Sequence, residues 1–297
     1  MLDNILNHYL NGIVMRSSQK PILVVEGEGD RRILQNHFLN VYMPGQSVVE
    51  MRGKICNSGD SIKDLSGVKV LIHIATKLKD KNINNSIVFL ADRDYRPDFD
   101  NVPNIHNLVF TEYHDFPMDL YTSLGDKKIS EMIYIALQSK KYTENDIHNI
   151  LSKTWDEAKE FSYKRYAVAH VHESLSQKHR NLGKIPNDPE KYKDFPNNIL
   201  RYYENRLGLS ESESHEVCNI LNSIISDDSA SSLKLVRDHN FISIFCKNIG
   251  HKLTSREFQN IFAFGIRCYD LMSIKSIEKI LDIFSNQDIL PCNKCNP

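Results

Sequence analysis

The sequence predicts an α/β fold: a small sheet, mainly parallel and flanked by helices, followed by a mostly α-helical carboxyl-terminal domain. Up to about residue 125, short apolar runs alternate with segments of helical spacing, which is typical of a parallel sheet covered by helices. Beyond residue 127, apolar residues recur with helical spacing, and strands are hard to find. We therefore expect an α/β domain over residues 1–126 and a helical domain over residues 127–297.

The elements of the α/β domain follow in order from its amino terminus. Residues 3–16 have the spacing of an amphipathic helix. The run PILVV at 21–25 is typical of a strand that is buried on both faces. Asp30 is a suitable N-cap for a helix over residues 31–42. The later elements are a strand over 47–51, a helix near 61–81 and strands over 86–94 and 107–113.

The carboxyl-terminal half is predicted to be helical from a series of segments with helical spacing. A connection that contains Pro and Asn lies near residues 183–198. The expected helices are 131–141, 144–175, 197–207, 214–225, 254–272 and 276–284.

The composition is that of a globular chain without a membrane span. Of 297 residues, 41% are hydrophobic and 25% are charged, which allows a full core. No run of 18 apolar residues occurs, so we expect no membrane span. The first residues lack the basic start, apolar run and cleavage site of a secretion signal. We therefore expect a cytoplasmic location.

Cysteine usage leaves two interpretations of the carboxyl-terminal CxxC pair. Cys292 and Cys295 supply two thiolates, whereas a structural zinc site takes four ligands. The pair is therefore either two free thiols at a frayed end or part of a zinc or redox site.

Acidic residues follow the predicted strands at their carboxyl ends. Glu26 ends the first strand, Asp92 and Asp94 end the third, and Asp115 follows the fourth. In a parallel sheet these ends lie at one edge, where ligands bind. Carboxylates brought together repel one another unless a cation neutralises them, and hard divalent ions such as Mg²⁺ or Mn²⁺ prefer oxygen ligands. The pattern therefore predicts a divalent metal site at this edge.

Asp92 and Asp94 are two residues apart, so an extended chain presents both on one side. Such a pair can bind one metal ion, or two ions of the kind that assist phosphoryl transfer. The competing interpretation is a polar turn after a strand. A dinucleotide-binding loop at Gly27–Arg32 is disfavoured, because Arg32 replaces the third glycine and neighbouring acids repel a pyrophosphate.

Three segments resemble the motifs of TOPRIM nucleases. ILVVEGEGD resembles the first TOPRIM motif, FLADRD the DxD motif, and TEYHDFPMDLY the third block of the OLD-like members. The chain as a whole most resembles the TOPRIM effectors of the PARIS anti-phage defence systems. The motifs cover about a third of the chain, and the helical half adds only general likeness.

The resemblance implies a role for each matching acid. Glu26 would be the key catalytic acid and a metal ligand, Asp92 and Asp94 would be catalytic metal ligands, and Asp30 and Asp115 would complete the set. The implied cofactor is Mg²⁺ or Mn²⁺. The chain departs from the motif at Pro117, where the proteins it resembles usually have Glu, so the number of metal ions, one or two, stays open. Either Asp119 or Glu112 would replace the ligand that is missing at Pro117. The alternative is that both are surface acids.

Several basic residues indicate how a nucleic acid is held, and each can also be interpreted as an ordinary solvated surface residue. Lys54, in a loop, either contacts a phosphate or is a solvated lysine. The segment 159–206 is rich in lysine, arginine and tyrosine, as on a nucleic-acid-binding surface or a solvated helix. We do not expect His170 and His172 to share zinc, because positions two apart on a helix point to different sides. The basic candidates within 159–206 are Lys164, Arg165, Lys178 and Arg180.

The sequence therefore predicts a metal-dependent endonuclease that hydrolyses phosphodiester bonds. The resemblance further implies a homodimer that cuts host transfer RNA as a toxic anti-phage effector. It also implies a companion ABC-type ATPase that holds the enzyme inactive. Three alternatives remain: a non-catalytic TOPRIM binding module, a DNA-directed TOPRIM nuclease, and a TOPRIM enzyme of primer synthesis or strand passage.

Overall fold

The described part of the chain forms two compact units. The first holds the residues up to Arg93, those from 104 to Ser123 and those from Ile266 onward, and the second holds those from Leu124 to Gly265. The computed structural model describes residues 2–17, 20–35, 47–50, 67–79, 86–93, 104–137, 141–171, 200–201, 208–226, 234–250 and 252–285.

The first unit contains a four-stranded sheet in which every pair of neighbouring strands is parallel. The strand order is β2-β1-β3-β4. Val25 at the end of β1 lies opposite Glu50 of β2 and Leu90 of β3. The expected α/β fold with a helical part is confirmed. The strands are β1 (Ile22–Val25), β2 (Ser47–Glu50), β3 (Ile87–Ala91) and β4 (Leu108–Phe110).

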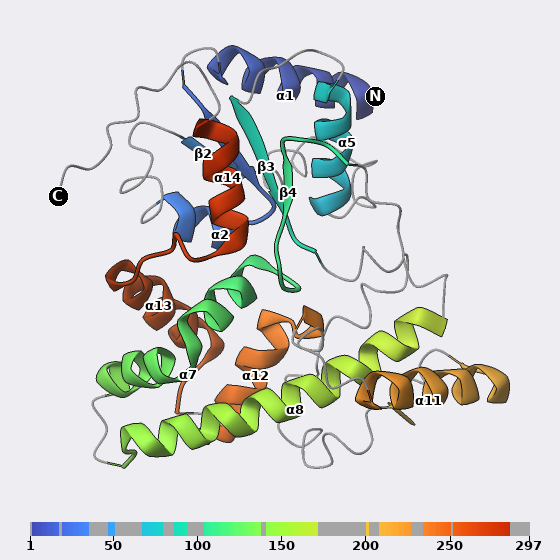
Figure 1. Ribbon diagram of the computed structural model, residues 1–297, viewed down its shortest axis with the longest axis vertical. Helices are drawn as coiled ribbons and strands as arrows, with labels where there is room; N and C mark the ends of the chain where they lie inside the picture. The colour runs from blue at the N-terminus through green and yellow to red at the C-terminus, as the bar shows by residue number, and fades with distance from the viewer. Residues whose placement is uncertain are drawn as a thin grey trace. The chain divides into compact units, whose positions relative to one another are not determined.

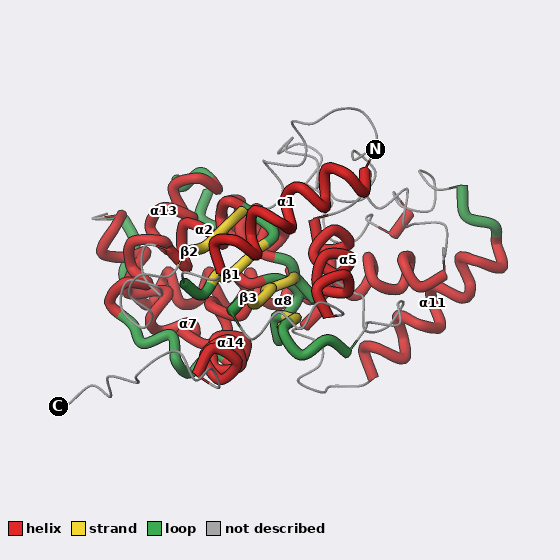
Figure 2. The backbone as a smooth tube through the Cα atoms, turned by 90° about the horizontal axis from the view of Figure 1, so that it is seen from above, coloured by secondary structure: helices red, strands yellow, loops and turns green. Residues whose placement is uncertain are grey.

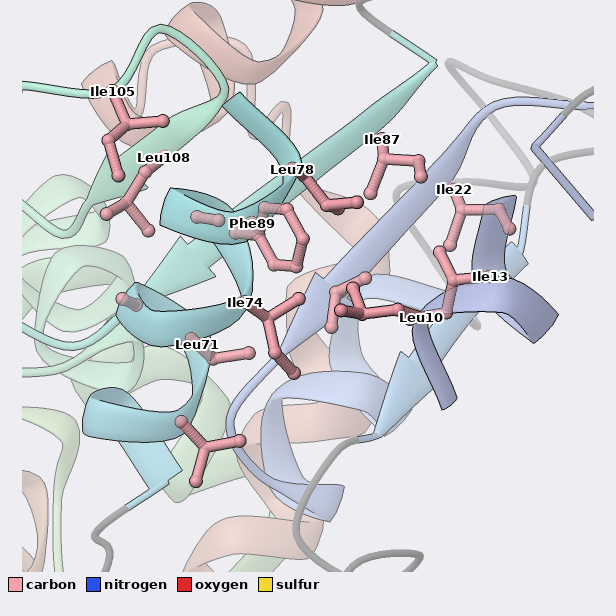
Figure 3. Close-up of a cluster of buried hydrophobic side chains, with 14 of the residues drawn as sticks. Leu10, Ile13, Ile22, Leu71, Ile74, Leu78, Ile87, Phe89, Ile105 and Leu108 are labelled. Carbon is pink, nitrogen blue, oxygen red and sulfur yellow. The ribbon is translucent and has the colours of Figure 1, made fainter. Parts of the chain in front are cut away.

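One face of the sheet packs against α1 (Leu2–Ser17) and α5 (Gly67–Lys79). Alternate residues of a strand point to opposite faces, so Ile22 and Phe89 lie on this face. Figure 3 shows their side chains meeting those of α5 and α1. The labelled members of this core are Leu10, Ile13, Ile22, Leu71, Ile74, Leu78, Ile87, Phe89, Ile105 and Leu108.

The other face of the sheet is covered by α14 (Lys275–Ser285), which contacts β3 and β4. Figure 1 shows α14 in front of the strands, and Figure 2 shows α14 and α1 on opposite sides of them. Leu23 and Leu90 point to the α14 side and are buried. The side chains that α14 buries are Ser276, Ile277, Ile280, Ile283 and Phe284.

This packing divides the chain differently from the expected domains, 1–126 and 127–297. A helix over 276–284 was expected in the helical domain, but α14 belongs to the unit that contains the sheet. The physical reason is that its apolar face covers sheet residues that would otherwise be exposed to water.

The boundary between the units falls inside α7 (Phe116–Leu137), which bends at Gly125. Gly125 has φ 73° and ψ 161°, a conformation that glycine adopts at little cost. The sequence indicated a helix only over 131–141 of this region. The structure extends it back to Phe116, directly after Asp115.

The second unit is helical. In its core the indole of Trp155 packs against Phe241, with ring centroids 4.3 Å apart. The long helix α8 contacts both α11 and α12. Its helices after α7 are α8 (Glu144–Val171), α11 (Glu211–Ser226), α12 (Asp238–Asn248) and α13 (Ser255–Gly265); the short 3-10 helix Ile266–Cys268 that follows belongs to the first unit.

Two local features differ from the sequence expectations. The helix α12 was not foreseen, because its core FISIF is aromatic and β-branched, which does not favour a helix. The helix α2 (Glu28–Ile33) begins two residues before Asp30, so Gly27 is its N-cap and Asp30 is inside the first turn. Residues 36–42 of the expected helix over 31–42 lie outside the described residues.

Within the described residues, none of the helices combines the length and the apolar character needed to cross a bilayer.

The packing of α14 gives a testable prediction. Ile280 is fully buried and Lys279 beside it is exposed. We expect Ile280→Ala to lower the free energy of unfolding by about 2–5 kcal/mol, because it removes buried methyl groups and leaves a cavity. Lys279→Ala is the matched control and should have little effect. Urea unfolding of both variants measures the difference; equal stabilities would show that α14 does not cover the sheet.

Candidate active site at the carboxyl edge of the sheet

The strand order places a reversal point between β1 and β3. From β1 the chain passes to β2 on one side, and it then crosses to β3 on the other side. Ligands of open α/β sheets bind outside the carboxyl ends of the strands at such a reversal. Glu26 directly follows β1 and Asp92 directly follows β3. These two acids therefore lie at the edge where a ligand is expected.

Hydrogen bonds continue the pairing of β3 and β4 beyond the strands. The Thr111 amide donates to the Ala91 carbonyl oxygen at 3.1 Å. The Arg93 amide donates to Thr111 Oγ1 at 2.9 Å, and Thr111 Oγ1 donates to the Tyr113 carbonyl oxygen at 2.7 Å. The residue after Asp92 is thus fixed to the segment that leads to Asp115.

Asp92 and Asp115 are brought together at the start of α7. The Phe116 amide donates to Asp92 Oδ1 at 3.3 Å, and the Met118 amide donates to Asp115 Oδ1 at 3.1 Å. First-turn amides have no acceptor within the helix, and the helix dipole favours negative charge there. Pro117 lies in the same turn, where a missing N–H costs nothing. The structure thus shows why proline is tolerated at this position.

Glu26 and Asp30 flank a tight turn between β1 and α2. Glu26 is half-buried. The Gly27 amide donates to Asp30 Oδ2 at 3.2 Å, so Asp30 stabilises the start of α2. Glu28 accepts two bonds of 2.7 Å from the Arg31 guanidinium. The glycine-containing turn thus fixes the chain around Glu26.

Asp119 is a carboxylate inside the protein, with 2% of its surface exposed. It accepts hydrogen bonds from the amides of Glu112 (3.1 Å) and Tyr113 (2.7 Å) and from Ser276 Oγ (2.6 Å). Burial raises the pKa of Asp119 to about 6, and the nearby charge of Asp115 acts in the same direction. Asp119 is therefore a structural acid that joins α7, the segment after β4 and α14, rather than a surface acid.

Of the three residues 112–114 that precede Asp115, only His114 is buried; Glu112 and Tyr113 are partly exposed. His114 is buried, with Nδ1 3.4 Å from Asp115 Oδ2. Burial raises the pKa of Tyr113, and the charges of Asp119 and Glu112 add to this. Glu112, the second proposed replacement ligand, has its Oε1 3.8 Å from Lys275 Nζ.

The donor chemistry of this edge fits a hard divalent cation, because Glu26, Asp92 and Asp115 all offer carboxylate oxygens. Among the residues that the structure describes, three or more His, Cys, Asp or Glu side chains are not gathered in one metal-binding group. Asp94 and Lys54, two of the expected site residues, lie outside the described residues.

The two basic candidates on α8, Lys164 and Arg165, are less exposed than the residues of an open basic surface. Arg165 is buried, with 4% of its surface exposed, because α8 packs against other helices. Lys164 Nζ is 2.7 Å from Glu160 Oε1 and its side chain is 13% exposed. A guanidinium inside the protein does not meet a nucleic-acid backbone, so Arg165 is removed from the proposed track. Lys178, Arg180, His172 and the pair Cys292 and Cys295 lie outside the described residues.

Ser276 is the residue of this edge that the sequence did not indicate. It is 157 residues from Asp119, and a serine at the start of a helix is most simply interpreted as a helix-terminus residue. Only the docking of α14 on the sheet brings its hydroxyl to Asp119.

Comparison of the chain with protein-family models and with curated proteins gives no match.

The pKa of Asp119 generates a prediction about stability. The folded protein binds this proton more tightly than the unfolded chain, where the carboxyl has its ordinary pKa of 3.8. Ionisation of Asp119 therefore lowers the free energy of unfolding as the pH rises from about 4 through about 6. We expect the unfolding free energy of the protein, relative to that of Asp119→Asn, to fall over this range and to level off above it.

Urea unfolding of both proteins in EDTA, at several pH values, measures this difference. A difference that is constant, or that grows as pH rises, would contradict the raised pKa.

Proposed function

We propose that this chain is a metal-dependent endonuclease that hydrolyses phosphodiester bonds. The observation that carries the proposal is the position of Glu26 and Asp92 directly after neighbouring parallel strands at the reversal point of the sheet. Asp115 joins Asp92 at the start of α7. Acids in this arrangement suit a site that takes an anionic phosphate together with a divalent cation.

Glu26, Asp92 and Asp94 are the residues proposed to hold Mg²⁺ or Mn²⁺, with Asp115 and Asp30 beside them. When bound, the ion would neutralise part of the negative charge of the carboxylates and the scissile phosphate. The amide of Phe116 holds Asp92 in a fixed orientation. Lys54 is proposed to contact the phosphate.

Glu26 is proposed as the general base. Its carboxylate accepts the proton of the attacking water, whose oxygen forms a bond to phosphorus. The bond from phosphorus to the leaving sugar oxygen breaks, and that oxygen takes a proton from solvent.

The resemblance to the TOPRIM effectors of PARIS systems supports a narrower proposal. The substrate is then RNA, specifically host transfer RNA, and the enzyme is a cytoplasmic homodimer that acts as an anti-phage toxin. A companion ABC-type ATPase holds it inactive until infection. Lys178 and Arg180, with Lys164, are the proposed contacts to the RNA.

One observation favours a second candidate, a non-catalytic TOPRIM binding module. Asp92 and Asp115 each accept an amide hydrogen bond from the first turn of α7, which by itself is a structural role. A binding module would retain these bonds and bind nucleic acid without cutting it.

A pair of glutamate variants tests the proposed chemistry. We expect Glu26→Gln to lower the cleavage rate by about 100-fold or more, because the amide neither accepts the proton nor binds the cation as a carboxylate does. Glu28→Gln is the matched control: Glu28 is two residues away, pairs with Arg31 and has no proposed catalytic role. The assay follows cleavage of transfer RNA and of single- and double-stranded DNA with Mg²⁺ or Mn²⁺.

Each outcome of that assay separates the candidates. Cleavage of RNA by the wild type and Glu28→Gln, but not by Glu26→Gln, supports the ribonuclease, and cleavage of DNA alone supports the DNA-directed alternative. Binding without cleavage by the wild type identifies the binding module. Undiminished cutting by Glu26→Gln rejects the assignment of the site.

A further inference from the structure

A hydrogen-bond network connects the carboxyl-terminal helix to the acid edge. Ser276 Oγ, 1% exposed, donates to Asp119 Oδ2 at 2.6 Å. Asp119 in turn accepts the amides of Glu112 and Tyr113, in the segment between β4 and α7. The same carboxylate therefore contacts α14 and the segment that carries Asp115.

The network extends to the end of β3. Thr111 Oγ1 donates to the Tyr113 carbonyl oxygen and accepts the amide of Arg93, which lies between the two acids of the DxD motif. Asp92 is held from the other side by the Phe116 amide. These hydrogen bonds connect Asp119 with the backbone beside both Asp92 and Asp115.

We infer that Asp119 and Ser276 are positioning residues of the acid edge, so that α14 takes part in forming the divalent-cation site. The inference rests on the proposed function for its connection to catalysis. Neither side chain acts on the substrate: they fix the backbone of residues 111–115 and thereby the carboxylates that bind the ion. Mutation of groups that orient metal ligands in this way commonly lowers metal affinity or activity by about 10–100-fold.

The role is separable from the stability that α14 contributes. The buried side chains of Ile277, Ile280, Ile283 and Phe284 hold the helix on the sheet by apolar contact. Removal of the Ser276 hydroxyl leaves this apolar face intact. The substitution removes one of the three hydrogen-bond donors of the buried Asp119 carboxylate. Water does not replace a hydrogen bond lost at this position.

Ser276→Ala is the test, and Ser273→Ala is its matched control. Ser273 lies two residues before α14, and its exposed hydroxyl is 3.2 Å from Ser123 Oγ. We expect Ser276→Ala to raise the Mn²⁺ concentration for half-maximal cleavage by about tenfold. We also expect faster amide hydrogen exchange at residues 92–93 and 111–116, measured without metal. Ser273→Ala should change neither quantity, and Asp119→Asn should change both in the direction of Ser276→Ala.

The two measurements separate two kinds of failure. Hydrogen exchange needs only folded protein, so unchanged exchange at 111–116 in Ser276→Ala overturns the positioning role whether or not the protein is a nuclease. An unchanged Mn²⁺ requirement in an active variant overturns the link to the cation. Failure of the wild type to cut nucleic acid, together with faster exchange in the variant, instead rejects the proposed nuclease and retains the connection through Asp119.

Discussion

The first amides of α7 hold the carboxylates on which the proposed site depends. A helix start has amide groups without intrahelical acceptors, and here the amides of Phe116 and Met118 donate to Asp92 and Asp115. The first turn of α7 thereby fixes both Asp92, which directly follows β3, and Asp115, which directly precedes α7. Pro117 is tolerated in the same turn because no amide is required there. The arrangement explains how both acids are oriented and why proline is tolerated at position 117.

The return of α14 to the sheet is the second constraint. A parallel sheet needs cover on both faces, and α14 supplies it on the face opposite α1 and α5. Its docking also delivers Ser276 to Asp119, so that the edge is built from residues near both ends of the described chain. The carboxyl-terminal segment is therefore part of the unit that contains the acids, and the helical second unit ends before it.

The four strands of the sheet were predictable from sequence, because each contains a short apolar run, and acids follow three of them. The position of Asp92 beside the segment that leads from β4 to Asp115 follows from the parallel pairing of β3 and β4. Other features depend on packing between distant segments. The charge of Arg165 did not reveal that its side of α8 faces other helices, and α12 combines helix geometry with a strand-like composition. The contact of Ser276 with Asp119 spans 157 residues and has no local signal.

The central claim is that carboxylates from separate strand ends share a divalent cation. Diffraction from crystals grown with Mn²⁺, recorded where manganese scatters anomalously, tests it most directly. The account predicts an anomalous peak at the carboxyl edge of the sheet, coordinated by Glu26 and by Asp92 or Asp94. The absence of a peak at this edge at a saturating Mn²⁺ concentration would contradict the account. A peak whose ligands do not include Glu26 would also contradict it.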